Sequence, residues 1–280
     1  MSAGDFPEPG QSRPGAGSAQ GHPAEAAGGA AGELARLRQH NAELLAAQQA
    51  FMARVVHDLR APLRHVTSYG VLVRELLDEL RGELPQAPKQ VAEALDCMAT
   101  MERSARRMVA MLDALRALHE AATAPLQPQP VDTTRLVAQV QAQLSERAAD
   151  RAVCWQVQPA MPWLLADPAL LRSALVQLLD NALKFTRGRD PAHIAIQAGA
   201  LNGRVRLSIE DDGAGFDPQR AQQLFGLFER LHREAEFEGL GTGLALCREI
   251  ARRHAADIRI SAAAGQGCRV ELDWPAAPPA

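Results

Sequence analysis

The sequence predicts an α+β chain in which a helical hairpin precedes a domain built from strands and helices. Three observations lead to this prediction. Apolar residues recur at helical spacing from about residue 33 to about residue 122. The proline-containing segment AATAPLQPQP at 121–130 then interrupts this pattern. Beyond it, stretches of alternating polar and apolar residues are separated by helical stretches, which is typical of a sheet covered on one face by helices.

The composition excludes several classes of function. The 280 residues suffice for two domains, and a formal net charge of −3 gives no electrostatic reason to expect nucleic acid or an anionic membrane as a partner. The four cysteines are far apart and lack metal-ligand or redox spacing, so they are expected to be reduced thiols. The sequence has no apolar run of about 18 residues and no basic-then-apolar N-terminus. We therefore expect a cytoplasmic protein without a membrane segment.

Two segments precede the hairpin. Residues 1–32 are rich in Gly, Ala, Pro, Ser and Gln, which cannot bury enough apolar surface to order the chain, and they predict a disordered tail. Residues 33–56 place apolar side chains alternately three and four residues apart, with polar interruptions at Asn41 and Gln48. This spacing predicts a coiled-coil signalling helix that continues directly to His57. Because three heptads are a minimum for a coiled coil, an ordinary amphipathic helix stays open as the alternative.

The hairpin is expected at 45–122, overlapping the end of the coiled coil. Its first helix continues to Leu80, the segment RGELPQAP at 81–88 marks a turn with its glycine and prolines, and a second helix follows. Since an isolated hairpin would leave an apolar face exposed, a second copy is expected to complete a four-helix bundle, which predicts a homodimer. A linker at 123–130 separates the hairpin from a domain at 131–275.

The stretch VVHDLRAPLRHV at 55–66 places Pro62 inside the first helix of the hairpin. Proline lacks a backbone N–H, and its ring collides with the carbonyl four residues back, here that of Asp58, so the distortion falls beside His57. A histidine and an acid side by side on a helix are usually no more than a solvated surface pair. The motifs of the second domain decide whether this pair has a chemical role.

The second domain alternates between helices and strands. The run from Thr133 to Ala149 predicts a helix, and a longer helix begins at Pro168 with Asp167 as its N-cap. The strands HIAIQAG and RVRLSIED are joined by a turn at Asn202–Gly203. The other expected strands are AVCWQVQP, DIRIS and CRVELDW, and a further helix is GLALCREIARRH.

Three motifs in this domain carry chemistry. DNALKF lies on the long helix, DDGAGFD follows a strand directly, and GLGTGLAL opens a helix near Leu244. Each is weak alone, since glycine pairs after strands are usually turns and GLGTG lacks the spacing of a dinucleotide-binding fingerprint. Together they favour a phosphate site, because a glycine-rich backbone entering a helix N-terminus offers N–H groups and a positive dipole end.

In order and spacing the three motifs resemble the ATP-binding domain of sensor histidine kinases, within the superfamily that includes gyrase and MutL. HDLRAPLRH resembles the phosphoacceptor box of these kinases and LFGLFERLH their phenylalanine box, and the wording is most similar to the bacterial phytochrome-like branch. The resemblance covers roughly residues 45–275. It implies a dimeric helical-hairpin domain followed by an α/β sandwich ATP-binding domain, with ATP and Mg²⁺ as cofactors.

The resemblance also implies roles for single residues. Asp211 accepts a hydrogen bond from the adenine amine, which selects ATP over GTP. Asn181 and Gln177 are the expected Mg²⁺ ligands, because magnesium prefers hard oxygen donors. Lys184 faces the phosphates, and Arg230 approaches the γ-phosphate below a lid, LHREAEFE, that orders over ATP. The remaining nucleotide-binding residues are Gly213, Gly215, Phe228, Gly239, Gly241, Gly243 and Leu244, with Phe225 beside Phe228 at the base of the lid.

Within this set of motifs His57 is the implied nucleophile. One ring nitrogen attacks the γ-phosphate of ATP, while Asp58 accepts the proton of the other nitrogen and makes the attacking one more electron-rich. The Pro62 kink lets the hairpin bend as His57 is presented to the ATP-binding domain. The phosphate then passes to an aspartate of a response regulator, and the input comes either from an upstream sensor protein or through the coiled coil. His65 lacks an adjacent acid and is expected to be structural.

Four positions depart from the family pattern. Gln177 stands where Asn is usual, Leu240 replaces a Thr of the lid, and RHAAD at 253–257 replaces a glycine pair. Ala61 stands where many members carry Thr or Asn to position water, which predicts weak or absent phosphatase activity on the regulator. Gln177 and Leu240 keep open a second interpretation, a dimeric scaffold or pseudokinase without phosphotransfer. A non-kinase ATPase of the gyrase or MutL type would need a catalytic acid at position 177 and is discounted.

Overall fold

The computed structural model describes residues 39, 56, 59, 62–80, 89–148, 151–231 and 237–277. The chain divides into two compact units, residues 1–50 and residues 51–280, and the helical hairpin and the second domain both lie in the latter. The predicted tail, nearly all of the predicted coiled coil and the pair His57 and Asp58 lie outside the described residues. The predicted kink between Asp58 and Pro62 is outside them for the same reason.

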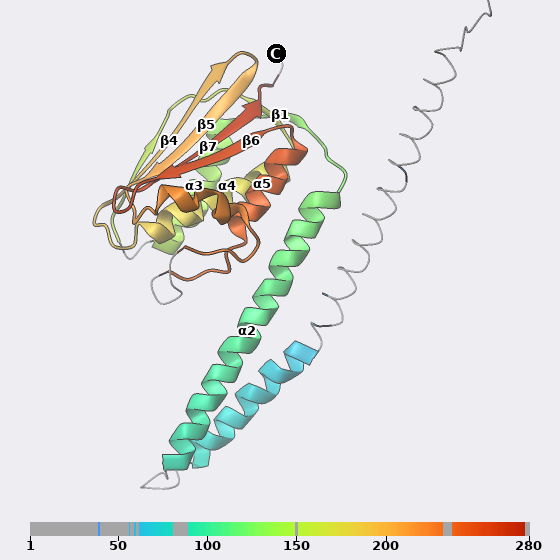
Figure 1. Cartoon of the computed structure of the whole chain (residues 1–280), viewed down its shortest axis with the longest axis vertical. Coiled ribbons are helices and arrows are strands. Elements are labelled where there is room, and N and C mark those ends of the chain that lie inside the picture. The colour runs from blue at the N-terminus through green and yellow to red at the C-terminus, as the bar shows by residue number, and fades with distance from the viewer. Residues whose placement is uncertain are drawn as a thin grey trace, which may run out of the picture. The chain divides into compact units, whose positions relative to one another are not determined.

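Two helices form an antiparallel hairpin, as predicted (Figure 1). The first spans residues 62–80 and the second, α2, spans Lys89–Thr123. They meet where Gly70 leaves room for Glu102, since a Cβ at position 70 would lie 3.3 Å from Glu102 Cγ. Glu102 is only 2% exposed, and its Oε2 pairs with Arg74 at 3.5 Å and with Arg106 at 3.4 Å. A glycine and a shared carboxylate therefore define the crossing of these helices.

The second domain is an α/β sandwich, which confirms the predicted fold class (Figure 1). Its sheet has the strand order β2-β4-β5-β7-β6, with β2 parallel to β4 and the other neighbours antiparallel. The strands are β2 Val153–Val157, β4 Ala192–Leu201, β5 Arg204–Asp211, β6 Asp257–Ala262 and β7 Cys268–Pro275. The helices on one face are α3 Thr133–Ser145, α4 Pro168–Phe185 and α5 Gly243–Arg253. Two short 3₁₀ segments complete the domain: η1 Glu146–Ala148 follows α3, and η2 Pro218–Phe225 lies between β5 and α5.

A small two-stranded sheet lies where the chain enters this domain. Its strands β1 Gln129–Val131 and β3 Leu164–Ala166 pair antiparallel, so β1 occupies the end of the segment expected as a linker. The last turns of α2 pack against α5, and Arg253 Nη1 donates a hydrogen bond to the carbonyl of Ala121 at 2.7 Å. Ala121 is 2% exposed and belongs to the core of the second domain.

Alternating burial explains the sheet. Along β5 the side chains of Val205, Leu207 and Ile209 are buried beneath the helices, whereas Arg206 and Glu210 are exposed on the opposite face. The helices pack leucine side chains against this face of the sheet, and burial of each such side chain contributes roughly 1.5–3 kcal/mol to the free energy of folding. The most deeply buried large side chains are Leu144, Leu164, Leu171, Leu175, Leu178, Leu179, Ile194, Ile196, Leu207, Ile250, Leu272 and Trp274.

Local signals in the sequence set the ends of the elements. Asp167 accepts hydrogen bonds from the N–H groups of Ala169 and Leu170 and so caps α4, with Pro168 as its first residue, as predicted. The turn between β4 and β5 has φ of 52° at Asn202 and 73° at Gly203, which is the left-handed pair that a two-residue hairpin requires. Among the described residues no helix is both long and apolar enough to cross a bilayer.

A buried histidine ties α5 to the N-terminus of α4. His254 is 6% exposed, its Nε2 accepts the N–H of Asp167 at 2.9 Å, and its Nδ1 donates to the carbonyl of Ile250 at 2.8 Å. The imidazole packs on the Trp274 ring with centroids 4.8 Å apart. These two bonds need the neutral Nδ1–H form, and burial lowers the pKa of the His254 imidazole from 6.5.

The stability of the domain is therefore expected to fall on mild acidification. The unfolded chain takes up a proton at His254 near its ordinary pKa of 6.5, while the folded chain resists it, so this contribution is full above that pH and is lost as the pH falls through the lowered pKa. A His254→Gln variant should be less stable near neutral pH by about 1–3 kcal/mol. It should also lose less stability on acidification, as urea unfolding at several pH values would measure. An equal pH dependence in the variant would contradict this assignment.

Candidate active site

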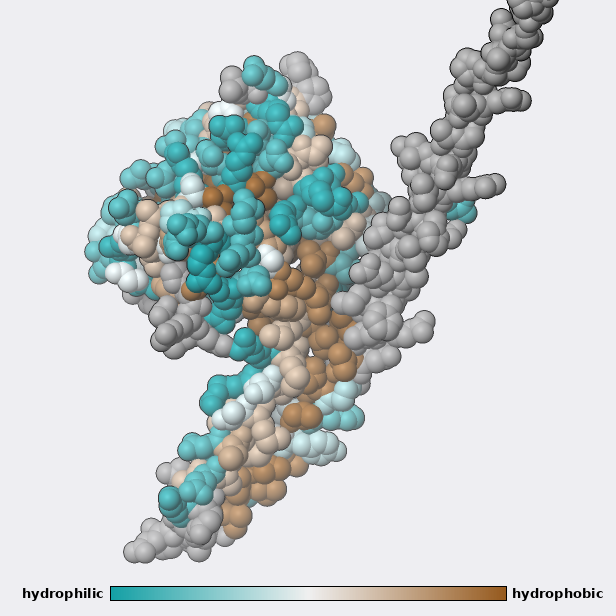
Figure 2. All heavy atoms as spheres, in the orientation of Figure 1, coloured by the Kyte–Doolittle hydropathy of each residue, from teal (hydrophilic) through white to brown (hydrophobic). Residues whose placement is uncertain are grey.

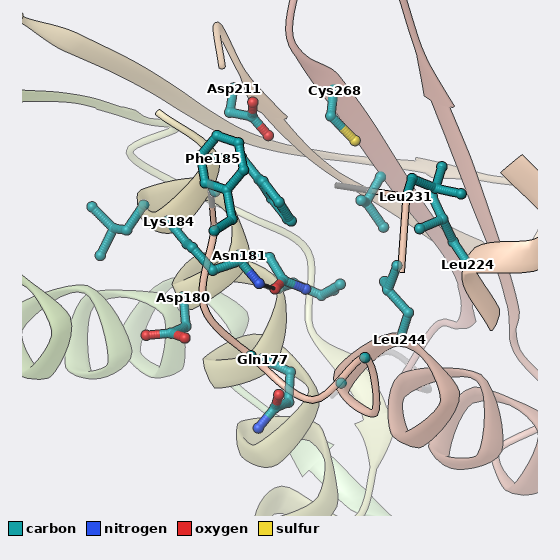
Figure 3. Close-up of a pocket in the computed structure, with 18 of the residues that line it drawn as sticks. Gln177, Asp180, Asn181, Lys184, Phe185, Asp211, Leu224, Leu231, Leu244 and Cys268 are labelled. Atoms are coloured by element: carbon teal, nitrogen blue, oxygen red, sulfur yellow. Dashed lines mark hydrogen bonds between the residues drawn. The ribbon is translucent and has the colours of Figure 1, made fainter. Parts of the chain in front are cut away.

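A single cavity gathers most of the predicted site residues (Figure 3). Its volume is about 850 Å³, within the range typical of pockets that bury a drug-sized ligand. The walls come from α4, from the ends of β5 and β7, and from the loop that leads into α5. Ten of the predicted residues line it: Gln177, Asn181, Lys184, Asp211, Gly215, Arg230, Gly239, Gly241, Gly243 and Leu244.

Asp211, the last residue of β5, forms one end of the cavity. Its side chain accepts hydrogen bonds from the backbone N–H groups of Gly213, at 2.9 Å, and Cys268. The residue is 8% exposed, and this burial raises the pKa of the carboxyl to about 6, although the two N–H donors oppose the shift. Gly213 does not line the cavity; a Cβ there would lie 2.6 Å from the carbonyl oxygen of Phe185, so it is the close approach of α4 that requires glycine.

The α4 wall carries an amide and an ammonium side by side. Lys184 Nζ donates to Asn181 Oδ1 at 3.1 Å and lies 4.3 Å from the centre of the Phe185 ring. Burial lowers the pKa of Lys184, and neighbouring Asp180 partly opposes this. An anion entering the cavity would meet this desolvated cation, and Asn181 Oδ1 would then be released for another partner.

Gln177 lies one turn before Asn181 and faces the start of α5. A Cβ at Gly243 would be 2.6 Å from Gln177 Oε1, so this glycine provides the space that the longer amide occupies. The amide oxygens of Gln177 and Asn181 are hard donors of the kind that Mg²⁺ accepts alongside water and phosphate oxygens. In the described part of the chain, no group of three or more His, Cys, Asp or Glu side chains is placed to hold a metal ion.

The N-terminus of α5 opens into the cavity. Its N-cap Thr242 forms no side-chain capping bond with any described residue, so the first N–H groups of α5 are left to other acceptors. Gly241 has φ of 74°, and a Cβ there would lie 2.3 Å from the Glu229 carbonyl oxygen. A helix start with uncapped N–H groups is a binding site for anions such as phosphate.

The described ends of the lid are tied to the rim of the cavity. Arg187 forms an ion pair with Glu238, and Arg230 donates to the carbonyl of Phe237. The Phe237 ring meets Phe185 edge-on, with centroids 5.0 Å apart. Residues 232–236 of the predicted lid lie outside the described residues.

The two phenylalanines expected at the base of the lid differ. Phe225 is buried and has the Arg248 guanidinium 5.7 Å from its ring centre. Phe228 is 37% exposed and is not among the residues that line the cavity. Its backbone has φ of 64° and its N–H donates to the Gly241 carbonyl at 3.0 Å, so position 228 contributes to the site through its backbone.

Sequence reasoning missed Cys268 as a site residue. It is the first residue of β7, pairs directly with Asp211, and turns its thiol into the cavity beside the carboxylate (Figure 3). Burial, and then the Asp211 charge, raise the pKa of the Cys268 thiol to about 12, so it stays protonated. The strand register that would have revealed this residue depends on pairing between distant parts of the sequence.

The fold and the cavity are together typical of a nucleotide-binding domain. The sequence profile described as histidine kinase-, DNA gyrase B-, and HSP90-like ATPase matches residues 166–278, which contain the cavity walls from α4 to β7. The match confirms the resemblance that the motifs DNALKF, DDGAGFD and GLGTGLAL predict.

Relatives extend this match to the hairpin. The adaptive-response sensory kinase SasA of Synechococcus elongatus is 30% identical over 230 residues, or 80% of this chain and 58% of the relative. Cyanobacterial phytochrome A of a Nostoc species is 28% identical over 242 residues, or 85% of this chain and 30% of the relative. The crystal structure of full-length ShkA in complex with AMPPNP aligns with a TM-score of 0.58 and 25% identity over 82% of this chain and 46% of that one. The chain is thus similar to sensor histidine kinases over most of its length, and residues 166–278 match their ATP-binding domain. It spans less than two thirds of each of these relatives.

Replacement of Asp211 is expected to increase stability. Because the folded pKa is raised to about 6 from 3.8, the stabilising contribution of the protonated carboxyl is full below pH 3.8 and is lost as the pH rises through about 6. Near neutral pH an Asp211→Asn variant avoids burying a charge and should gain up to about 3 kcal/mol. Urea unfolding would measure this gain.

The matched control is Asp212→Asn. Although burial raises the pKa of Asp212, the backbone N–H and ring of His193 lower it further, so the charged form of this carboxylate is favoured in the fold. This control should gain no stability near neutral pH. A loss of stability in the Asp211→Asn variant would show that the N–H groups of Gly213 and Cys268 outweigh the cost of burial.

Proposed function

We propose that this chain is the core of an ATP-dependent protein-histidine kinase that phosphorylates its own His57. The observation that carries the proposal is that one cavity has a buried carboxylate at one end and, at the other, a cation and a helix start that no described side chain caps. A nucleoside triphosphate has the matching arrangement, with a hydrogen-bond donor on the adenine base and negative charge on the phosphates.

The residues of the cavity divide the binding of ATP between them. Asp211 accepts the exocyclic amine of adenine and disfavours guanine, which presents a carbonyl there. Lys184 and the first N–H groups of α5 face the phosphates, and Arg230 approaches the γ-phosphate from the rim. Asn181 and Gln177 would hold Mg²⁺, which when bound neutralises phosphate charge. The neighbour ShkA was crystallised in complex with AMPPNP, which supports nucleotide binding by this chain.

The transfer step uses the predicted pair in the hairpin. A ring nitrogen of His57 forms a bond to the γ-phosphorus as the bond from that phosphorus to the β–γ bridging oxygen breaks, and ADP leaves. The proton on the opposite ring nitrogen passes toward the Asp58 carboxylate. In a second transfer the nitrogen–phosphorus bond breaks as a carboxylate oxygen of a response regulator's aspartate takes the phosphoryl group. These roles rest on the motif HDLRAPLRH.

The hairpin favours a homodimer. Figure 2 shows apolar residues along its surface, in brown, in an amount that a solvated helix pair would not keep. A second copy of the hairpin would cover them in a four-helix bundle, on which a receiver domain could dock near His57. Among the described residues of the hairpin, the exposed large apolar ones are Leu59, Val66, Tyr69, Leu72, Val73, Leu76, Leu80, Met101 and Met108.

One observation favours a second candidate, a dimeric scaffold that binds nucleotide or regulator without phosphotransfer. Gln177 stands in place of the usual Asn, and its oxygen lies against the start of α5, where it competes for the space next to the phosphates. Transfer of label from ATP to the protein would separate the two candidates.

Incubation with Mg²⁺ and ATP labelled at the γ-phosphate should phosphorylate the wild-type protein and leave a His57→Gln variant unlabelled. The label should be acid-labile and stable to alkali, as a phosphohistidine is. His65→Gln is the matched control, because His65 lies eight residues after His57, exposed on the first helix of the hairpin and without an adjacent acid, and this variant should label normally. Bound ATP without label in the wild type would favour the scaffold, and label retained in the His57→Gln variant would exclude His57 as the acceptor.

Phosphatase activity on the phosphorylated regulator is expected to be weak, because Ala61 offers no hydrogen bond to position water. An Ala61→Thr variant should raise this activity several-fold over wild type while leaving autophosphorylation unchanged, because the added hydroxyl can hydrogen-bond the attacking water and hold it in place. Loss of phosphate from purified phospho-regulator would be followed over time. Fast turnover by the wild type, independent of His57, would refute the prediction.

A further inference from the structure

The direction of the Asp211 carboxylate depends on two loops that are far apart in the sequence. One N–H donor, Gly213, belongs to the loop that follows β5, and the other, Cys268, ends the turn between β6 and β7. The two segments pack without space for a side chain, since a Cβ at Gly267 would lie 1.8 Å from the Asp211 carbonyl oxygen. A small separation of the loops would therefore move both donors away from the carboxylate.

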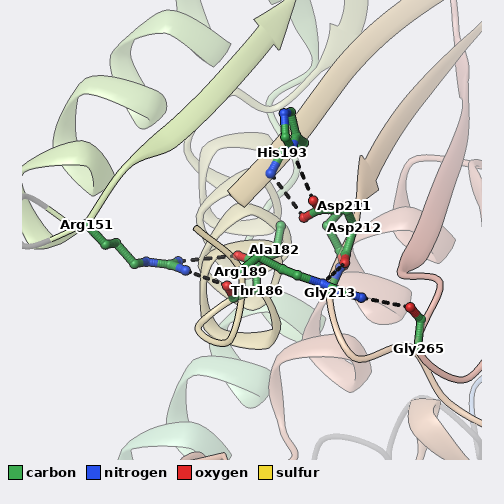
Figure 4. A network of polar contacts seen from close by, with 9 residues as sticks. All are labelled: Arg151, Ala182, Thr186, Arg189, His193, Asp211, Asp212, Gly213 and Gly265. Atoms are coloured by element: carbon green, nitrogen blue, oxygen red, sulfur yellow. Dashed lines mark hydrogen bonds and ion pairs between the residues drawn. The ribbon is translucent and has the colours of Figure 1, made fainter. Parts of the chain in front are cut away.

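Arg189 bridges these two loops (Figure 4). It lies in the turn after α4, where its own N–H donates to the Thr186 carbonyl at 2.9 Å. Its Nε donates to the carbonyl of Asp212 at 2.8 Å, and its Nη2 donates to the carbonyl of Gly265 at 2.8 Å. The planar guanidinium presents both donors in a fixed fork, so it holds two acceptors at a set separation.

Arg189 links the two loops by a side chain, as the Asp211 carboxylate does by accepting an N–H group from each. The Asp212 carboxylate is engaged by His193, which donates its backbone N–H and places Nδ1 at 3.0 Å, and this bond joins β4 to the first loop only. Between the loops themselves there is the backbone bond from Gly265 N–H to the Ala214 carbonyl at 2.7 Å. Arg189 does not line the cavity, so any influence on a ligand passes through the loops.

We propose that Arg189 is a positioning residue that sets the direction of the base-reading Asp211 carboxylate, and with it the preference for adenine over guanine. This inference rests on the proposed nucleotide site and adds a specificity element outside its walls. Loss of the clamp should weaken ATP binding about tenfold, which corresponds to a loss of about 1.4 kcal/mol in binding free energy. GTP, which Asp211 does not accept, should be affected little, so the ratio of the two affinities should fall.

The test compares three variants of the full chain by titration with ATP and with GTP. Arg189→Ala should lose about tenfold in ATP affinity, and Arg189→Lys, which keeps one donor, should lie between it and wild type. Arg204→Ala is the matched control, because Arg204 also donates to two carbonyls, those of Ala255 and Asp273, but at the opposite end of β5. It should keep both the affinity and the ratio. Equal losses for ATP and GTP, or equal losses in the Arg204→Ala control, would reduce Arg189 to a general stabilising residue and overturn the proposal.

A second measurement needs no ligand. Hydrogen exchange of the N–H groups of Gly213 and Cys268, followed by NMR, should become faster in Arg189→Ala and stay unchanged in Arg204→Ala. If wild type binds no ATP, the proposed function fails, and this exchange measurement still decides whether Arg189 positions Asp211. Unchanged exchange at both N–H groups would overturn the inference even if the nucleotide site is correct.

Discussion

A carboxylate buried at the end of a central strand is the constraint on which the site depends. Asp211 gives up water when β5 delivers it into the cavity, and the resulting rise in its pKa shows that the two N–H donors do not offset the whole cost of burial. The donors exist only if β5 and β7 pair with Asp211 opposite Cys268. That register in turn needs the buried alternation of both strands against α4 and α5. The sandwich therefore does more than support the site; its strand pairing supplies the site's hydrogen bonds.

The cost of burying the Asp211 carboxylate therefore falls at a place where a bound ligand can offset it. The buried Asp211 carboxylate accepts two backbone N–H groups, and a donor from an entering base would add a further hydrogen bond to it. The same holds at the other end of the cavity, where burial disfavours the charged form of Lys184 and the first turn of α5 lacks a side-chain cap among the described residues. Both ends gain more from a ligand that carries a donor and negative charge than from water. This complementarity is why the two poles of the cavity, taken together, favour a nucleotide over an apolar ligand.

The sequence predicts the local parts of this structure well because their causes are local. The Asp167 cap, the Asn202–Gly203 turn and the amphipathic α4 each depend on residues a few positions apart. The strand order, with β2 beside β4 and β7 between β5 and β6, depends on pairings that no short window contains. The same limit explains the site.

Motif residues could be placed by resemblance, whereas Cys268 and Arg189 act through neighbours distant in the sequence. Phe228 was expected to bind nucleotide, but it is 37% exposed and does not line the cavity.

The ties at the rim indicate how a ligand could enter. The Arg187–Glu238 pair that holds one end of the lid is largely exposed, and ion pairs of this kind contribute about 0–1 kcal/mol because water and salt screen them. The Phe237 ring adds an edge-on contact with Phe185, which lies beside Lys184 on α4. Opening the described part of the lid thus costs little compared with moving α4 or the sheet.

Under the proposed function the site would separate two demands: paired strands hold the carboxylate that would contact the base, and a weakly held rim would admit and release the phosphates. Gly243 lets the start of α5 approach α4, because it has no side chain where Gln177 Oε1 lies. The Gln177 side chain, longer than the usual Asn, therefore fits beside the start of α5 without displacing that helix.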